Sequence, residues 1–254
     1  NYRTSSGYIR AEFSSKGVGN LGIMKPDIMS PGVSVVSARA VVGGSYDQKE
    51  LTIKHGTSMA TPISAGAAAL VYQYFKDGKY RKVPMEISSS LARSFLITCS
   101  DPLTTVYPNP SEGFGLLNLG KCIGNGDEVD NKRLLVSDRL KITSDDGTST
   151  HQMANFTVKV NEGEKIDLRV TLSYLDLVLS ADSVSALAID IDLVVVSPSG
   201  VVYRGNMRPD NTEERYMTNE RVIVDSEKVE SGDYEIHVFS TIPNDLKSMS
   251  DKVN

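Results

Sequence analysis

The spacing of apolar residues changes near residue 130 and predicts helices before that point and strands after it. From Ser58 to about Lys76, apolar residues recur every three to four positions, which predicts an amphipathic helix. Pro84 predicts the start of a second helix that runs to about Ile97, because proline is favoured in the first turn of a helix. The stretch from residue 101 to 113 carries three prolines and predicts a loop.

Residues beyond about 133 follow a different rule, because apolar and polar positions alternate there. Alternation over 156–160, 166–172 and 234–238 and an apolar run over 192–196 each predict a strand, and turn signals separate them. Short strands with repeated turns are typical of an all-β sandwich or jelly roll. The turn signal at 124–127 suggests a linker, so we expect two domains, residues 1–125 and 133–254.

Residues 56–62, Gly-Thr-Ser-Met-Ala-Thr-Pro, are the most informative stretch for chemistry. They follow a strand-like run and open an alanine-rich helix, so small residues can present the Ser58 hydroxyl at a helix N-terminus. Unsatisfied N–H groups and the positive end of the helix dipole favour a nearby anion there. An acyl-transfer nucleophile needs this arrangement, since the backbone N–H beside the attacking oxygen can bind the oxyanion. An ordinary N-cap serine is the alternative.

This stretch resembles the nucleophile motif of the subtilisin-like serine proteases, and further phrases resemble that family in the same order. They are Phe-Ser-Ser-Lys-Gly at 13–17, Lys-Pro-Asp-Ile-Met-Ser-Pro-Gly-Val at 25–33 and Gly-Phe-Gly-Leu-Leu-Asn at 113–118. The resemblance covers roughly residues 8 to 125. It implies an α/β fold, the C-terminal part of a doubly wound parallel sheet. Ser58 would be the nucleophile, Gly56 and Thr57 would shape its turn, the substrate would be a protein or peptide, and the chemistry would need no cofactor.

The other parts of a catalytic triad are not evident in the sequence. In this family the order is Asp, His, Ser, and the histidines here are His55, His151 and His237. His55 stands three residues before Ser58 without a residue to orient it, so we do not expect it to act as the base. We expect the His, the Asp and the oxyanion Asn to come from an upstream segment, the missing N-terminal half of the catalytic domain.

Two consequences follow for the chain by itself. We expect it to be inactive, and we expect it to be stable only with its missing half, as a dimer or after rearrangement, because helix residues such as Leu70 and Val71 would lack partners. The alternative function is a non-catalytic pseudoprotease, or a β-sandwich module that binds another protein or supports folding. The intact nucleophile turn argues against this alternative.

Residues 190–203 resemble a phrase in the C-terminal β-domain of some bacterial subtilases and in proprotein-convertase P-domains. Some of those domains bind calcium, so Asp176, Asp190 and Asp192 are candidate ligands for a structural calcium ion. Asp190 and Asp192 alternate and would share one face of a strand. Simple solvation, or pairing with Arg204, is the alternative. The family's asparagine before this phrase is replaced by Ile189.

Composition narrows the remaining possibilities. The 254 residues carry a formal net charge of −5, which argues against a nucleic-acid partner, and no apolar run is long enough to be a transmembrane segment. For Cys99 and Cys122 we favour two buried free thiols over a bond, because Cys99 ends an apolar run. Asn155-Phe156-Thr157 matches the glycosylation acceptor pattern. The habit of the family implies a secreted, lumenal or cell-surface protein.

Overall fold

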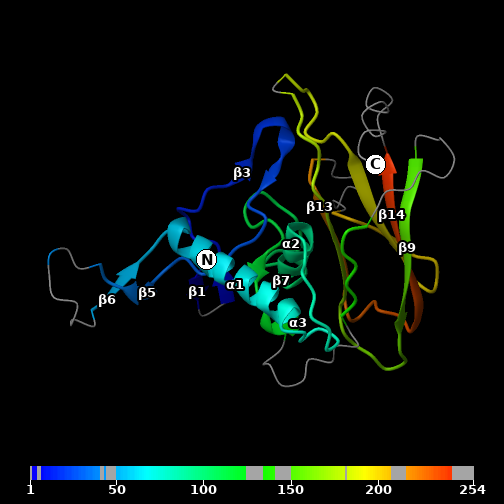
Figure 1. The fold of residues 1–254 in the computed structure, drawn as a ribbon, viewed down its shortest axis with the longest axis horizontal. Coiled ribbons are helices and arrows are strands. Elements are labelled where there is room, and N and C mark those ends of the chain that lie inside the picture. Colours follow the sequence, from blue (N-terminus) through cyan, green and yellow to red (C-terminus); the bar gives the residue numbers. More distant parts are fainter. Residues whose placement is uncertain are drawn as a thin grey trace.

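A computed structural model describes residues 2–4, 7–40, 43, 50–123, 134–140, 150–180, 182–206 and 216–241. The described chain is mixed α/β, with helices and several antiparallel sheets. Figure 1 shows the helices beside two antiparallel sheets, with the β5–β6 hairpin extending away from them. The predicted linker at 124–127 lies outside the described residues, so the two-domain division stays a prediction.

The first part of the chain combines two main helices with short paired strands. Its pairs are β1 with β2, β3 with β4, β5 with β6 and β7 with β8, all antiparallel. Within the described residues, one parallel bridge joins Met29 to Leu116. The predicted segment of a doubly wound parallel sheet therefore stays a prediction. The elements are β1 Tyr2–Thr4, β2 Gly7–Ile9, β3 Gly17–Val18, η1 Asn20–Gly22, β4 Met24–Lys25, β5 Val35–Ala38, β6 Leu51–Lys54, α1 Thr57–Lys76, α2 Ser89–Thr98, β7 Ser100–Asp101, β8 Leu116–Leu117 and α3 Gly120–Ile123.

Helix α1 has the predicted length, whereas α2 begins five residues after the predicted start at Pro84. The reason is a competing cap at Ser88. Its Oγ accepts a hydrogen bond from the Leu91 N–H at 3.0 Å and donates one to Asp138 at 2.5 Å. A serine that satisfies one of the free N–H groups of the first turn fixes the start of a helix more strongly than a proline outside it.

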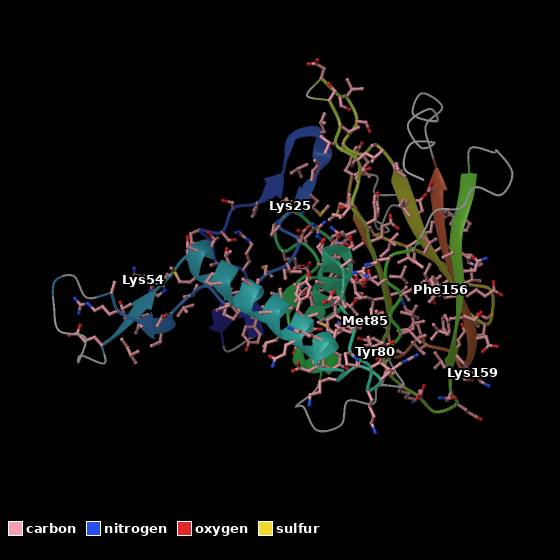
Figure 2. The ribbon with its side chains drawn as sticks, in the orientation of Figure 1. Lys25, Lys54, Tyr80, Met85, Phe156 and Lys159 are labelled. Carbon is pink, nitrogen blue, oxygen red and sulfur yellow. A yellow bond between two sulfur atoms is a disulfide. The ribbon has the colours of Figure 1, made fainter. Side chains whose placement is uncertain are left out.

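The core between α1 and α2 is built from aromatic and aliphatic side chains. Phe75 of α1 and Phe95 of α2 meet edge to face, with ring centroids 5.5 Å apart. Tyr80 and Met85, labelled in Figure 2, lie in the same core. We expected Val71 and Leu70 to lack partners. For Val71 this is wrong, because it is fully buried in this core, whereas Leu70 on the outer face of α1 is 55% exposed.

Cys99 and Cys122 form a disulfide, so the prediction of two free thiols is wrong. The short pairing of β7 with β8 and a hydrogen bond from the Asn118 N–H to the Cys99 carbonyl, 2.8 Å long, bring α3 to the end of α2. The two Cα atoms are 5.7 Å apart, within the range that a disulfide spans. The bond closes the loop that contains residues 100–121.

The second part of the chain forms two antiparallel sheets with a shared hydrophobic core. One sheet has the order β12-β11-β14-β9 and the other pairs β10 with β13. Leu193, Val222 and Tyr234 lie in the core between them, which also takes in residues from β9 and β10. The bounds are β9 Thr150–Val160, β10 Leu168–Ser173, β11 Asp190–Val196, β12 Val202–Arg204, β13 Asn219–Val224 and β14 Gly232–Thr241. The predicted strands are confirmed as strands, and the assignment to a jelly roll or β-sandwich family stays a prediction.

Candidate functional site

Ser58 lies in the first turn of α1, and its side chain is exposed. Gly56 precedes the helix as its N-cap with φ 149° and ψ 163°, a conformation that side chains with a Cβ rarely adopt. The Met59 N–H donates to the Gly56 carbonyl at 3.1 Å, whereas the N–H groups of Thr57 and Ser58, at the first two positions of the helix, have no carbonyl of a preceding turn to bind. The turn therefore places a hydroxyl beside N–H groups that can bind an anion, as the sequence predicted.

The segment around Gly32 packs against the Ser58 turn and forms a hydrogen bond to it. The Gly56 N–H donates to the Gly32 carbonyl at 2.8 Å. A Cβ on Gly32 would stand only 2.8 Å from the Gly56 carbonyl oxygen, so a larger residue would push the turn away. Nearly two turns further along α1, the hydroxyls of Ser30 and Ser64 are 2.6 Å apart. The Lys-Pro-Asp…Pro-Gly phrase thus packs against the Ser58 turn.

Backbone hydrogen bonds connect this bracing segment to the Gly-Phe-Gly phrase at 113–115. The Phe114 N–H donates to the Asp27 carbonyl and the Met29 N–H donates to the Gly115 carbonyl, both at 2.8 Å. Gly113 has φ 59°, and a Cβ there would meet the Pro26 carbonyl oxygen at 2.1 Å. Only glycine fits this close approach. The segments 25–33, 56–62 and 113–118, which are separate in the sequence, are therefore connected by backbone hydrogen bonds in the structure.

Arg221 of β13, in the second part of the chain, binds the end of α2 and the Gly-Phe-Gly phrase. Its guanidinium is 2% exposed and donates to the carbonyls of Ile97 at 2.8 Å, Ser100 at 2.9 Å and Phe114 at 2.7 Å. It also stacks over the Tyr107 and Phe114 rings, 5.0 and 5.1 Å from their centroids. Burial lowers the pKa of Arg221 to about 10. The hydrogen bonds of its two terminal nitrogens replace those of water, whereas the buried Nε has no hydrogen-bond partner among the described residues.

Arg169 of β10 makes a second contact to the end of α2. It donates to the Thr98 and Ser100 carbonyls, each at 3.2 Å, and pairs with Asp101 at 3.0 Å. Burial raises the pKa of Asp101, but hydrogen bonds from Lys121, Asn118 and Arg169 outweigh it, and the pKa lies below its ordinary value. Arginines at a helix C-terminus bind the last free carbonyls. Neither arginine was predicted from the sequence, although Arg221 directly precedes the apolar run 222–224.

The three histidines do not complete the site. The Nδ1 of His55 accepts a hydrogen bond from the Ser34 N–H at 2.9 Å, so in the neutral ring Nε2 carries the proton and neither nitrogen can take one from Ser58. His237 lies on β14, where Nδ1 contacts Asn155 at 2.8 Å and Nε2 contacts Glu235 at 3.2 Å. His151 belongs to β9. None of the hydrogen bonds of the described residues connects a histidine to Ser58.

The three predicted calcium ligands lie on and before β11. Asp176 accepts hydrogen bonds from the N–H groups of Leu177, Ala188 and Ile189 at 2.7 to 3.1 Å, so its carboxylate closes the connection between β10 and β11. Asp190 and Asp192 share the outer face of β11, as predicted. The described residues hold no group of three His, Cys, Asp or Glu side chains suited to a metal. Calcium binding gains no support from this arrangement and stays a prediction.

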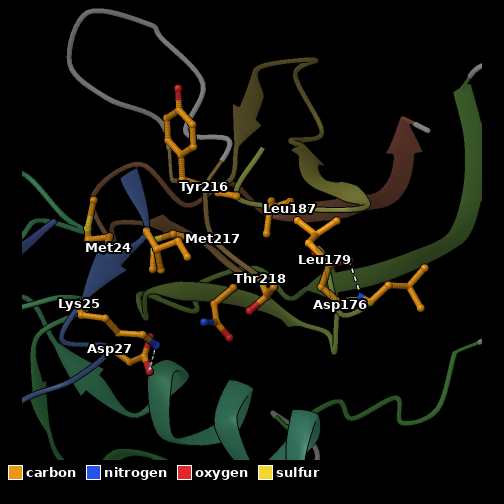
Figure 3. Close-up of a pocket in the computed structure, with 13 residues that line it drawn as sticks. Met24, Lys25, Asp27, Asp176, Leu179, Leu187, Tyr216, Met217 and Thr218 are labelled. Carbon is orange, nitrogen blue, oxygen red and sulfur yellow. Dashed lines mark hydrogen bonds and ion pairs between the residues drawn. The ribbon is translucent and has the colours of Figure 1, made fainter. Parts of the chain in front are cut away.

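A pocket of about 270 Å³ lies between the two parts of the chain. Figure 3 shows Met24, Met217 and the Lys25–Asp27 ion pair on one side and Leu187 and Leu179 on the other. Ser58 is not among its lining residues. The pocket belongs to the junction between the parts and does not include the Ser58 turn. No helix among the described residues is long and apolar enough to cross a membrane.

Comparison with known proteins finds a family match that includes the Ser58 turn. Residues 3–116 match the subtilase family (peptidase family S8). The serine protease/ABC transporter B family protein tagA of Dictyostelium discoideum is 25% identical over 284 residues, which cover 96% of this chain and 15% of that protein. Serine protease AprX of Bacillus subtilis is 43% identical over 76 residues, and subtilisin-like protease SBT4.14 of Arabidopsis thaliana is 37% identical over 127 residues.

The chain spans less than a fifth of each of these three relatives, because it covers 15%, 17% and 16% of their lengths. The match to AprX covers 26% of the chain and the match to SBT4.14 covers 46%. The similarity to the protease named tagA extends over the two antiparallel sheets as well, since that alignment includes nearly the whole chain.

Proposed function

We propose, from the premise that residues 3–116 belong to the subtilisin-like serine protease family, that the chain is the nucleophile-bearing part of a subtilisin-like endopeptidase. Its substrates are proteins or peptides. The observation that carries the proposal is the exposed Ser58 at the N-terminus of α1, in a turn braced by the Gly32 segment. Such a turn has no need of its glycines and close approaches if it serves only to cap a helix.

In the proposed reaction the Oγ of Ser58 attacks the carbonyl carbon of the scissile bond and forms an acyl-enzyme. The Ser58 N–H, in the first turn of α1, donates to the oxyanion. A histidine takes the proton from Oγ and gives it to the leaving amine, and an aspartate orients that histidine. Since His55 is engaged by Ser34, we assign the histidine, the aspartate and the second oxyanion donor, an asparagine, to a segment upstream of this chain.

The exposed apolar surface of the first part supports this assignment. Leu51 and Ile53 of β6 and Leu70 of α1 are 69%, 60% and 55% exposed, around the nucleophile turn and its helix. A surface of this kind is suited to packing against further polypeptide. We therefore propose that the chain by itself does not hydrolyse peptides, and that it does so as part of a longer polypeptide. Secretion, or a lumenal or cell-surface location, is also a proposal, which the Cys99–Cys122 disulfide supports.

The test is peptide hydrolysis by the polypeptide that includes this chain and its upstream segment. Ser58→Ala is expected to lower kcat by at least about 1,000-fold, since loss of a triad member leaves only binding and oxyanion catalysis. Ser89→Ala is the matched control, because Ser89 is also an exposed serine in the first turn of a helix. Equal activity of the Ser58→Ala variant and the wild type would contradict the proposal. A folded wild type without activity would favour a non-catalytic binding module.

A further inference from the structure

Asn155 and Thr157 lie on the outer face of β9, in the acceptor tripeptide Asn-Phe-Thr. Both side chains are exposed, while Phe156 between them packs against the core of the two sheets (Figure 2). The alternation of the strand thus places the amide and the hydroxyl on the same side, toward solvent. From this placement we propose that Asn155 is an N-glycosylation site.

The hydrogen bonding of Asn155 is compatible with a glycan. Its Oδ1 is 2.8 Å from His237 Nδ1, and since Oδ1 carries no hydrogen, the histidine is the donor. The Nδ2 atom makes no hydrogen bond to the described part of the chain. An N-linked sugar is attached at Nδ2 and leaves Oδ1 as an acceptor. The contact to His237 can therefore persist in the modified protein.

The order of synthesis also favours modification of Asn155. In the described residues β9 pairs with β14 alone, which makes it an edge strand of its sheet. Its partner His237 follows Asn155 by 82 residues. The tripeptide therefore cannot pair with β14 until the end of this part of the chain has been made, which leaves it accessible to an enzyme that acts on the growing chain.

A second and independent observation concerns the compartment. The Cys99–Cys122 disulfide is expected to persist in an oxidising environment such as the secretory lumen, where N-glycosylation takes place. The sequence contains one tripeptide of this pattern, because proline at position 110 excludes Asn109-Pro110-Ser111. Asn109 also differs in structure, since its Nδ2 donates to Glu112 at 2.8 Å. One glycan at one position is therefore expected.

The chemistry is a transfer from an oligosaccharide linked to a polyprenyl diphosphate. Nδ2 of Asn155 forms a bond to the anomeric carbon, and the bond between that carbon and the diphosphate oxygen breaks. The polyprenyl diphosphate leaves with that electron pair, and Nδ2 loses one proton to a base of the transferase. The attached glycan would stand beside the long edge strand β9 and hinder its pairing with another chain, which is the hazard of an exposed edge.

The experiment is to secrete the polypeptide from a eukaryotic cell and to treat it with a peptide N-glycosidase. The expected result is one shift in mass, with Asn155 converted to aspartate in the peptide that contains it. Thr157→Val removes the hydroxyl but keeps the β-branched shape, so it should abolish the shift, whereas Thr157→Ser should retain it. An unmodified Asn155 in the folded, secreted wild type, or an undiminished shift in Thr157→Val, would overturn the proposal.

Discussion

Replacing Arg221 by methionine tests whether the second part of the chain stabilises the segments that pack against the Ser58 turn. The guanidinium donates to three backbone carbonyls, of Ile97, Ser100 and Phe114. Ser100 retains a donor from Arg169 after the change, and the Ile97 carbonyl retains the N–H of Cys99. The Phe114 carbonyl loses the guanidinium as its donor, and a buried carbonyl without a partner costs about 1–3 kcal/mol.

The expected change in the free energy of unfolding is the sum of the lost hydrogen bonds and the recovered desolvation cost of the cation. The two bonds that are partly replaced contribute about 1 kcal/mol each. Removing the buried cation returns part of its desolvation cost, which burial shows by lowering the pKa of Arg221. We therefore expect Arg221→Met to lower the free energy of unfolding by about 3 kcal/mol, and Arg221→Lys by about half of that, because an ammonium cannot span the separate carbonyls.

The assay is urea unfolding followed by far-UV circular dichroism, since the sequence contains no tryptophan. Arg204→Met, at an exposed arginine of β12, is the matched control and should change the free energy of unfolding by less than about 0.5 kcal/mol. A change of less than about 0.5 kcal/mol for Arg221→Met as well would contradict the prediction. The contacts of β13 with the end of α2 and with the Gly-Phe-Gly phrase would then not stabilise the chain.

Three further predictions concern the same parts of the molecule. Replacing Cys99 and Cys122 by serine should lower the free energy of unfolding by roughly 3 kcal/mol, the loop-closure value for a sequence separation of 23, and urea unfolding with and without reductant measures this. Gly56→Ala should cost about 1–3 kcal/mol through backbone strain at φ 149° and slow peptide hydrolysis by the longer polypeptide, which thermal unfolding and kcat measure together. The pKa of Asp101 lies below its ordinary value of 3.8, so the Asp101 carboxylate stabilises the fold above that pH and loses this effect as the pH falls below it. The difference in the free energy of unfolding between Asp101→Asn and wild type should therefore shrink between pH 5 and pH 3, and a constant difference would contradict this.

The sequence predicted those elements in which one local signal dominates. Helix α1 was predicted because its apolar period and its glycine-serine start agree. Strand β11 was predicted from a continuous apolar run followed by a turn at 197–200, which the Gly200 N–H to Ser197 carbonyl bond confirms. Where two local signals compete, as Pro84 and Ser88 do before α2, the hydrogen-bonding cap decided the boundary.

Features that depend on distant contacts were not predictable from local patterns. Arg221 was missed because a charged residue in a strand ordinarily faces solvent, whereas both faces of β13 are covered, one by the sheet core and the other by the end of α2. The disulfide was missed because the spacing of Cys99 and Cys122 does not show that β7 and β8 pair between them. The predicted turn of Ser58 has the expected form because its determinants are adjacent in the sequence.

The central claim, that Ser58 is an activated nucleophile, is tested most directly by labelling with a fluorophosphonate probe. The probe should be applied to the folded polypeptide that carries this chain and its upstream segment, and the modified residue located by peptide mass. We predict a single adduct on Ser58, absent from Ser58→Ala and retained in Ser89→Ala. A folded wild type that takes up no probe, or an adduct on another serine, would contradict the account.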